Sequence, residues 1–305
     1  QLAEALRSEG LVYFQIGELS NGLEKLDKAY QQFIDMNYES DAAKVLVDIG
    51  CVYDAMGDID HAELCFSRSL EYWQKANSTL WQANLHNNIG VIQYQKGKYV
   101  ESIISFEKAL TYSRVSANPR LESYTLTSMG DLFRHLLAFK EARQAYSLAA
   151  TILEETNDLS LDIYVTLAQA ALERSSSNYH DASKLIEKAL TVASGSGSKF
   201  EYNSCLLEQS LLEFKAGHLD KLPETLLKLE SDFLASGHHV EAFKTAMLSL
   251  ILSSSVTQLN NIEEKLQQLS SSTKNSNYLA MLQIGLEFKD KLQSKASDAK
   301  YKEVL

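Results

Sequence analysis

Small side chains recur in this sequence every forty residues, and few folds can accommodate such an interval. The first series consists of Gly10, Gly50, Gly90, Gly130, Ala170 and Ser210. Two further series of small residues are Gly22, Ala62, Ser102, Ala142 and Ala182, and Ala29, Ser69, Ala109, Ala149 and Ala189. Between these two series lies one large position, occupied by Leu26, Phe66, Phe106, Tyr146, Ile186 and Leu226. Self-similarity at a fixed period indicates a repeat protein, in which each unit packs against its neighbours.

The clearest single unit spans residues 89–110 and predicts two antiparallel helices. Apolar residues recur at three- and four-residue steps on both sides of Gly97, as on one face of a helix. The small series let the two backbones approach closely, and the large position fills the space that they leave. Gly97 belongs to another forty-residue series with Gly17, Gly57 and Gly217, which Leu137 and Ser177 interrupt. Glycine there suits a helix end, where a left-handed residue is often required.

Two aspartates are expected to begin helices. Asp41 and Asp58 each precede an apolar periodic segment, which is where an N-cap residue accepts hydrogen bonds from free backbone N–H groups.

Composition excludes several classes of protein. Two prolines and 13 glycines are too few for an all-β fold, which needs a turn every ~8–12 residues. The formal net charge of −11 leaves no basic surface for direct contact with nucleic acid.

No apolar run approaches the ~20 residues of a membrane helix, and no signal peptide is evident. We therefore expect a cytoplasmic protein without a membrane partner. The chain begins with Gln1, so we expect a fragment of a larger protein or a processed product.

The small and large series resemble the tetratricopeptide repeat (TPR), together with Tyr13, Tyr53 and Phe133, which follow the first series by three residues. The resemblance implies an all-α fold: a right-handed superhelical solenoid of about seven helix-turn-helix repeats with a forty-residue period, plus a C-terminal capping helix. We expect one solenoid over residues 1–305, with repeats at about 1–40, 41–80, 81–120, 121–160, 161–200, 201–237 and 238–275, and the last helix at 276–305. A HEAT or armadillo solenoid, with a period of ~40–47 residues, is the rival. The small-large-small pattern favours the tetratricopeptide architecture.

Signatures of catalysis are missing from the sequence. Residues 195–199 are rich in glycine but lack phosphate-loop spacing, and no strand precedes them. His238 and His239 have no metal-ligand spacing, so we interpret them as a solvated turn. His135 and Asp131 are the only local acid–base candidates, and four residues apart they suit an ordinary pair on one helix face. We predict a protein that is not an enzyme, with no catalytic residues, no metal and no cofactor.

Without a catalytic signature, the concave surface of the solenoid is the candidate functional site. In a tetratricopeptide solenoid the first helix of each repeat lines the concave wall, so its positions outside the core face a groove. The candidate binding residues are Asn84, Asn87, Asn88, Tyr94, Gln95, Tyr124, Asp131, Arg134, His135, Tyr164 and Arg174. Amides, tyrosines and arginines combine flat apolar faces with hydrogen bonding, which suits a protein or peptide partner or a small-molecule effector.

Residues 127–142, with the forty-residue period, resemble the helical-repeat sensor domain of bacterial transcriptional regulators of the MalT-like type. The resemblance implies a non-enzymatic sensor domain that recognises an effector or partner in its concave groove. The alternative is a constitutive scaffold or adaptor that holds proteins together without sensing a ligand.

Overall fold

The computed structural model describes residues 1–154 and 156–252, together with residues 264, 267, 268, 283 and 286. Within the two continuous ranges every regular element is an α-helix, and there are thirteen of them. Their bounds are α1 Leu2–Gln15, α2 Leu19–Asp35, α3 Glu39–Met56, α4 Ile59–Lys75, α5 Thr79–Gln95, α6 Tyr99–Val115, α7 Pro119–His135, α8 Phe139–Leu153, α9 Leu159–Ser175, α10 Tyr179–Ser196, α11 Lys199–Ala216, α12 Leu222–Ala235 and α13 His239–Leu252.

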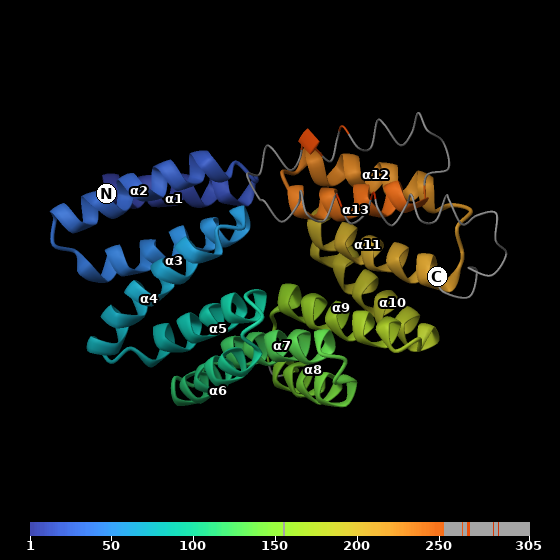
Figure 1. Cartoon of the computed structure of the whole chain (residues 1–305), viewed down its shortest axis with the longest axis horizontal. Coiled ribbons are helices and arrows are strands. Elements are labelled where there is room, and N and C mark those ends of the chain that lie inside the picture. Colours follow the sequence, from blue (N-terminus) through green and yellow to red (C-terminus); the bar gives the residue numbers. More distant parts are fainter. Residues whose placement is uncertain (155, 253–263, 265–266, 269–282, 284–285, 287–305) are drawn as a thin grey trace.

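Consecutive helices pack in pairs, and the pairs stack into a curved array (Figure 1). The helices α3, α5, α7, α9 and α11 lie on the inner side of the curve, and α4, α6, α8, α10 and α12 lie outside. Inner helices also contact the next inner helix, as α5 contacts α7 and α7 contacts α9. The predicted right-handed tetratricopeptide-like solenoid is thus confirmed. The predicted capping helix at 276–305 lies outside the described residues.

The small and large series meet in the core as predicted. Phe106 is fully buried, and a Cβ atom added to Gly90 would lie 2.6 Å from its Cε1 atom. The same added atom at Gly130 would lie 2.3 Å from Cε1 of Tyr146. Gly50, Gly90 and Gly130 therefore each receive the ring that stands sixteen residues later on the partner helix, and Gly10 receives the Leu26 side chain in the same way. The environments are equivalent from one repeat to the next, as the forty-residue interval requires.

The helix ends show a further regularity: a residue with left-handed backbone recurs every twenty residues from 17 to 237, except at position 157 in the α8–α9 connection. Positive φ angles occur at Gly17, Asn37, Gly57, Asn77, Gly97, Ala117, Leu137, Ser177, Gly197, Gly217 and Gly237. Leu137 and Ser177, which interrupt the glycine series, adopt the same conformation, with φ of 60° and 61°. At Gly57 the next N–H donates to Tyr53 O and that of Gly57 to Asp54 O, the Schellman pattern. At these turn positions the left-handed backbone conformation recurs even where the residue is not glycine.

One of the two predicted helix caps is confirmed. Asp58 is the N-cap of α4, and its carboxylate accepts the backbone N–H of His61 at 3.2 Å. Asp41 is not a cap, because α3 begins two residues earlier, at Glu39. Its charge lies in the first turn of the helix, where it interacts favourably with the helix dipole.

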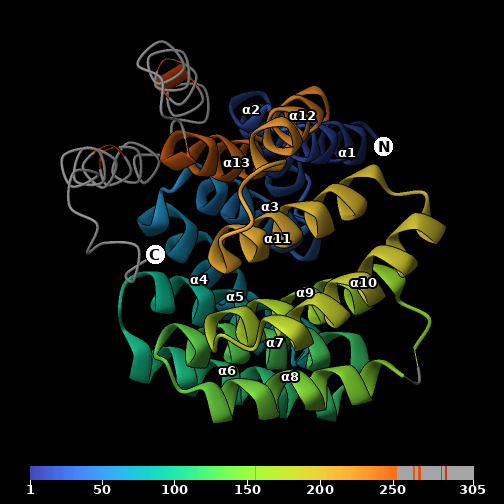
Figure 2. The same ribbon diagram turned by 90° about the vertical axis from the view of Figure 1, so that its right-hand side faces the viewer.

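His238 lies in the α12–α13 turn, as interpreted, and His239 begins α13, but both side chains are partly buried and pack against other residues. The His238 ring stacks on Phe200 with centroids 4.1 Å apart, and burial lowers the pKa of His238. His239 lies against Gly17, because the α12–α13 turn meets the α1–α2 turn (Figure 2). The sequence contains no local signal of this contact between residues far apart in the chain.

His86 makes the stability of the solenoid depend on pH. Its ring is 7% exposed and stacks on Tyr112, and burial followed by the nearby Lys108 lowers the pKa of His86 to about 4. The unfolded chain, with a histidine pKa near 6.5, therefore binds the proton more readily than the folded chain. Stability conferred by neutral His86 falls as the pH drops from about 6.5 to 4, by about 2 kcal/mol at pH 5.

Urea denaturation at pH 7 and pH 5 measures this effect when the parent protein is compared with His86→Phe. Asp48 and Asp54 titrate in the opposite direction, since burial raises both of their pKa values, but they are common to the two proteins. We expect the parent to lose about 2 kcal/mol more than the variant between these pH values. Equal losses in the two proteins would show that His86 takes up its proton in the folded state as easily as in the unfolded one.

Candidate functional site

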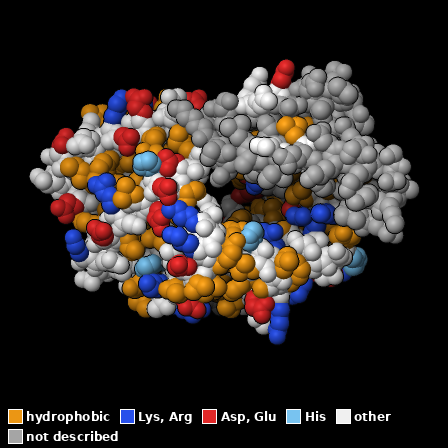
Figure 3. Space-filling view, in the orientation of Figure 1, with side chains coloured by type: hydrophobic (Ala, Val, Ile, Leu, Met, Phe, Trp, Pro, Cys, Tyr) orange, Lys and Arg blue, Asp and Glu red, His pale blue; other side chains and the backbone are white. Residues whose placement is uncertain are grey.

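The inner face of α5, α7 and α9 carries most of the residues expected to bind a ligand. Figure 3 shows a hollow near the centre of the molecule, bordered by hydrophobic side chains. The Tyr124 side chain is 42% exposed and that of Tyr164 is 40% exposed, although both belong to helices that pack on two neighbours. Their rings stack with centroids 6.0 Å apart. The two tyrosines therefore present an aromatic surface that spans two repeats.

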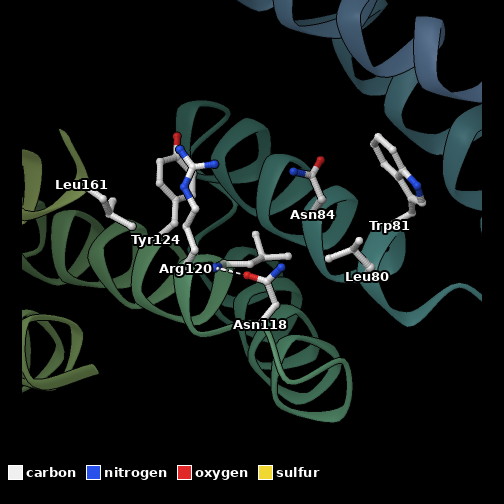
Figure 4. A pocket seen from close by; sticks show the side chains of 8 residues that line it. Leu80, Trp81, Asn84, Asn118, Arg120, Tyr124 and Leu161 are labelled. Atoms are coloured by element: carbon white, nitrogen blue, oxygen red, sulfur yellow. Dashed lines mark hydrogen bonds between the residues drawn. The ribbon is translucent and has the colours of Figure 1, made fainter. Parts of the chain in front are cut away.

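A pocket of about 340 Å³ opens beside Tyr124 (Figure 4). Its lining comes from the first turns of α5 and α7 and from the start of α9. The lining residues are Leu80, Trp81, Asn84, Asn118, Arg120, Leu121, Tyr124 and Leu161. Leu80 is 44% exposed, and Trp81 stacks on Trp73 with centroids 5.1 Å apart. Arg120 is held at the rim by an ion pair with Asp158, at 2.6 Å. The pocket thus has an apolar floor and polar groups at its edge.

Asp131 connects the aromatic surface to the core. Its Oδ1 atom accepts hydrogen bonds from the Tyr146 hydroxyl at 2.7 Å and from Arg134 Nη2 at 3.2 Å. Its Oδ2 atom accepts from the Tyr164 hydroxyl at 3.3 Å. Asp131 therefore joins the candidates Arg134 and Tyr164 directly, and Tyr146 of the core series completes the network. This network fixes the orientation of the Tyr164 ring.

The tyrosine hydroxyls of this site stay protonated. Burial raises the pKa of Tyr164, and the Asp131 carboxylate raises it further. Burial likewise raises the pKa of Tyr124. The phenols act as neutral hydrogen-bond donors or acceptors and do not supply a base.

Two other candidates form a separate aromatic group at the opposite end of the same helices. The rings of Tyr94 and His135 meet edge to face with centroids 5.2 Å apart, and His135 Nε2 lies 3.4 Å from the hydroxyl of Tyr99. His135 thus has aromatic neighbours, and the Asp131 carboxylate bonds to other groups, so these two residues do not form an acid–base pair. Gln95 donates to the Asp54 carboxylate of the preceding repeat at 3.0 Å.

Three asparagines of α5 form a short ladder, of which two face the groove. Asn88 Nδ2 donates to Asn84 Oδ1, and Asn87 Nδ2 donates to Asn88 Oδ1, both at 3.5 Å. The expectation that Asn87 faces the groove is wrong, because it is only 1% exposed. Its position points between neighbouring inner helices, as the buried Val47 and Thr127 do at the same place in their repeats.

Arg174 is directed away from the aromatic surface. Its guanidinium makes two hydrogen bonds with the Glu208 carboxylate, at 2.7 Å and 3.3 Å. This pair joins α9 to α11, and Arg7 and Asp48 join α1 to α3 in a similar way at 2.6 Å. Such partly buried pairs hold successive inner helices in register.

The groove positions chosen from the sequence miss most of the pocket lining. The helix register predicts only Asn84 and Tyr124 among the lining residues, because groove positions are expected from six residues before to five residues after the first small series. Trp81, Leu121 and Leu161 all stand nine residues before that series, and all are large and apolar. That forty-residue recurrence at the mouth of the groove is the signal that could have found them.

Neither a metal site nor a membrane segment is found in the described part of the chain. There, no group of three or more histidine, cysteine, aspartate or glutamate side chains could hold a metal ion. Over the same residues, none of the helices combines the length and apolarity that crossing a bilayer requires.

Sequence comparisons point to helical-repeat proteins. The family of soluble NSF attachment proteins, SNAP, matches residues 8–129, less than half of the chain. The kinesin light chain-related 3 protein of Arabidopsis thaliana is 26% identical over 178 residues, which cover 53% of this chain and 27% of that protein. The chain therefore spans about a quarter of the length of this curated relative.

Structural comparisons extend over nearly the whole chain at low sequence identity. A Rap protein complexed with Competence and Sporulation Factor has a TM-score of 0.70 and 15% identity, covering 94% of this chain and 75% of that one. NprR in complex with its cognate peptide NprX has a TM-score of 0.62 and 13% identity, with coverage of 92% and 84%. A signal transduction ATPase of Pyrococcus horikoshii with a tetratricopeptide repeat sensor has a TM-score of 0.56 and 16% identity, with coverage of 95% and 44%. The chain shares the tetratricopeptide-like fold with these proteins.

Proposed function

We propose that this tetratricopeptide-like solenoid is a non-enzymatic recognition module that binds a peptide or protein segment on the inner face of α5, α7 and α9. The observation that carries the proposal is the aromatic surface of Tyr124 and Tyr164 beside the open pocket. Rigid aromatic faces that stay exposed next to an apolar cavity are typical of the residues that dominate binding energies.

The pocket suits one large apolar side chain of an extended peptide. Its volume of about 340 Å³ lies at the lower end of the range for ligand pockets. Asn84 and Asn118 stand at its edge, where an amide can both donate to and accept from the main chain of a peptide. Two proteins of the same fold have structures with a bound partner: a Rap protein with Competence and Sporulation Factor, and NprR with its cognate peptide NprX. A small-molecule effector is a second occupant of suitable size.

We further propose that the module is the sensor domain of a cytoplasmic bacterial transcriptional regulator, without direct contact with nucleic acid. The tetratricopeptide sensor of the archaeal signal transduction ATPase supports this role by its fold. Stacked repeats contact only their neighbours, so small angular changes at each interface add along the array. A ligand that fits one curvature better than another would then shift the equilibrium between them.

A constitutive adaptor is the second candidate, and the sequence matches to the kinesin light chain-related and SNAP families favour it. Small-angle X-ray scattering with and without a bound peptide distinguishes the two. A sensor changes its radius of gyration on binding, whereas an adaptor keeps the same dimensions.

Selection from a random library of short peptides tests the binding proposal. We expect peptides selected on the parent protein to bind Tyr124→Ala at least about tenfold more weakly in isothermal titration calorimetry, because the variant removes the wall shared by the pocket and the aromatic surface. The two proteins should have similar melting temperatures, since the Tyr124 side chain is 42% exposed.

Leu148→Ala is the matched control. Leu148 is a large apolar residue of the outer helix α8 with 44% exposure, so its removal should leave peptide affinity unchanged. Selected peptides that bind Tyr124→Ala as tightly as the parent would contradict the proposed site. So would a selection that enriches no peptide above a library panned on bare support.

A further inference from the structure

The two ends of the described array touch each other. The α1–α2 turn contains Ile16 and Gly17, and the α12–α13 turn contains Gly237. A Cβ atom added to Gly17 would lie 2.2 Å from the carbonyl oxygen of Gly237, and one added to Gly237 would lie 1.9 Å from that of Ile16. Figures 1 and 2 both place these turns next to each other. The backbones therefore approach too closely for any side chain at either position.

This approach is separate from the requirement for a left-handed backbone. Gly17 and Gly237 have φ angles of 78° and 75°, but Gly97 and Gly197 have similar angles of 71° and 73°. An added Cβ atom at Gly97 or Gly197 would meet nothing within 4 Å. Elsewhere the same turn position accepts Leu137 and Ser177. Contact with the opposite end of the described array, and not local conformation alone, distinguishes Gly17 and Gly237.

Side chains from both ends surround the contact. A cavity of about 180 Å³ beside it is lined by Phe14 and Leu19 from the first repeat and by Val240 from α13. The ring of His239 faces Gly17, where a Cβ atom would come within 2.3 Å of Cδ2. The junction thus combines close backbone approach with apolar and aromatic side chains.

We propose that these two turns form an intramolecular clasp that closes the superhelix into a ring and holds its curvature. In an open array the angles between neighbouring repeats vary independently, and their variations add along the chain. A contact between the first repeat and α13 removes that freedom, because the angles must then sum to one closed circuit. The clasp holds the inner groove at one width in the peptide-free protein.

Spin labels on either side of the junction measure the closure directly. Ser20 and Ala235 are both exposed and lie close to the two turns, so cysteines at these positions accept labels without disturbing the core. Burial raises the pKa of Cys51 to about 12 and the pKa of Cys65 and Cys205 to about 11, so the native thiols react slowly. The parent protein without the added cysteines gives the background labelling.

Gly17→Ala and Gly237→Ala are compared with Gly97→Ala and Gly197→Ala by double electron–electron resonance, without any peptide. All four variants carry the same strain of a left-handed alanine, but only the first two place a Cβ atom in the junction. We expect a short and narrow distance distribution in the labelled parent and in the two controls, and a longer and broader one in Gly17→Ala and Gly237→Ala.

A broad distribution in the labelled parent that Gly17→Ala leaves unchanged would overturn the clasp. Equal lengthening in the control variants would do the same, because strain in the turn alone would then explain it. Peptide affinity is measured independently, so the clasp can fail while the binding site holds, and the reverse.

Discussion

Replacing Phe106 with alanine is expected to lower the free energy of unfolding by about 3–5 kcal/mol. The ring is fully buried and fills the space opposite Gly90, where no other side chain can replace it. Removing it leaves a cavity between α5 and α6, the two helices of a central repeat. Because neighbouring repeats stabilise one another, a defect in a central unit also weakens the interfaces on both sides.

Urea denaturation followed by circular dichroism measures this loss, with Ile104→Ala as the control. Ile104 belongs to the same helix and is 46% exposed, so its truncation removes few packed contacts. A denaturation midpoint of Phe106→Ala close to that of Ile104→Ala would show that the large series does not form the core of the repeats.

Adding a methyl group at Gly90, opposite the Phe106 ring, should also destabilise the fold. Gly90→Ala adds a methyl group 2.6 Å from Cε1 of Phe106, so the ring must move. Overpacking of this kind costs about 1–3 kcal/mol, and it acts against the gain of about 1 kcal/mol that alanine has over glycine within a helix. We expect a net loss of stability in the denaturation midpoint.

A double variant separates packing from helix propensity. In the Phe106→Ala background the ring is gone, so Gly90→Ala should become neutral or stabilising. Gly195→Ala provides the control, because Gly195 lies in α10 with nothing within 4 Å of an added Cβ atom. It should raise stability by up to about 1 kcal/mol. If Gly90→Ala and Gly195→Ala have the same effect in the parent, the small series is not set by contact with the rings.

The fold could be predicted because its main determinant is periodic. Gly90 and Phe106 lie only sixteen residues apart, and their pairing repeats along the chain, so one correct unit predicts the others. The twenty-residue recurrence of left-handed residues was less visible, since Leu137 and Ser177 adopt that conformation without being glycine. Residue type is a weak guide wherever the backbone pattern of the neighbouring helices already determines the turn.

The site was predictable only in part, because its residues come from different repeats. The position of Tyr124 follows from the helix register, but its contact with Tyr164 depends on the angle between α7 and α9. Asn87 was misplaced because helix periodicity does not distinguish the groove from the seam between two inner helices. The junction of Gly17 with Gly237 was beyond prediction, since it depends on the summed curvature of all the repeats between them.

The uniform turns also bear on how a chain of this kind can change in length. Most joints are built alike, so a duplicated or deleted forty-residue unit with such joints would leave the remaining ones intact. The meeting of Gly17 with Gly237, however, joins turns that stand five and a half units apart. Gain or loss of a repeat would displace the turn that contains Gly237 from the turn that contains Gly17. In such a molecule the contact between the two turns restricts the number of repeats, although each repeat by itself could be exchanged for another.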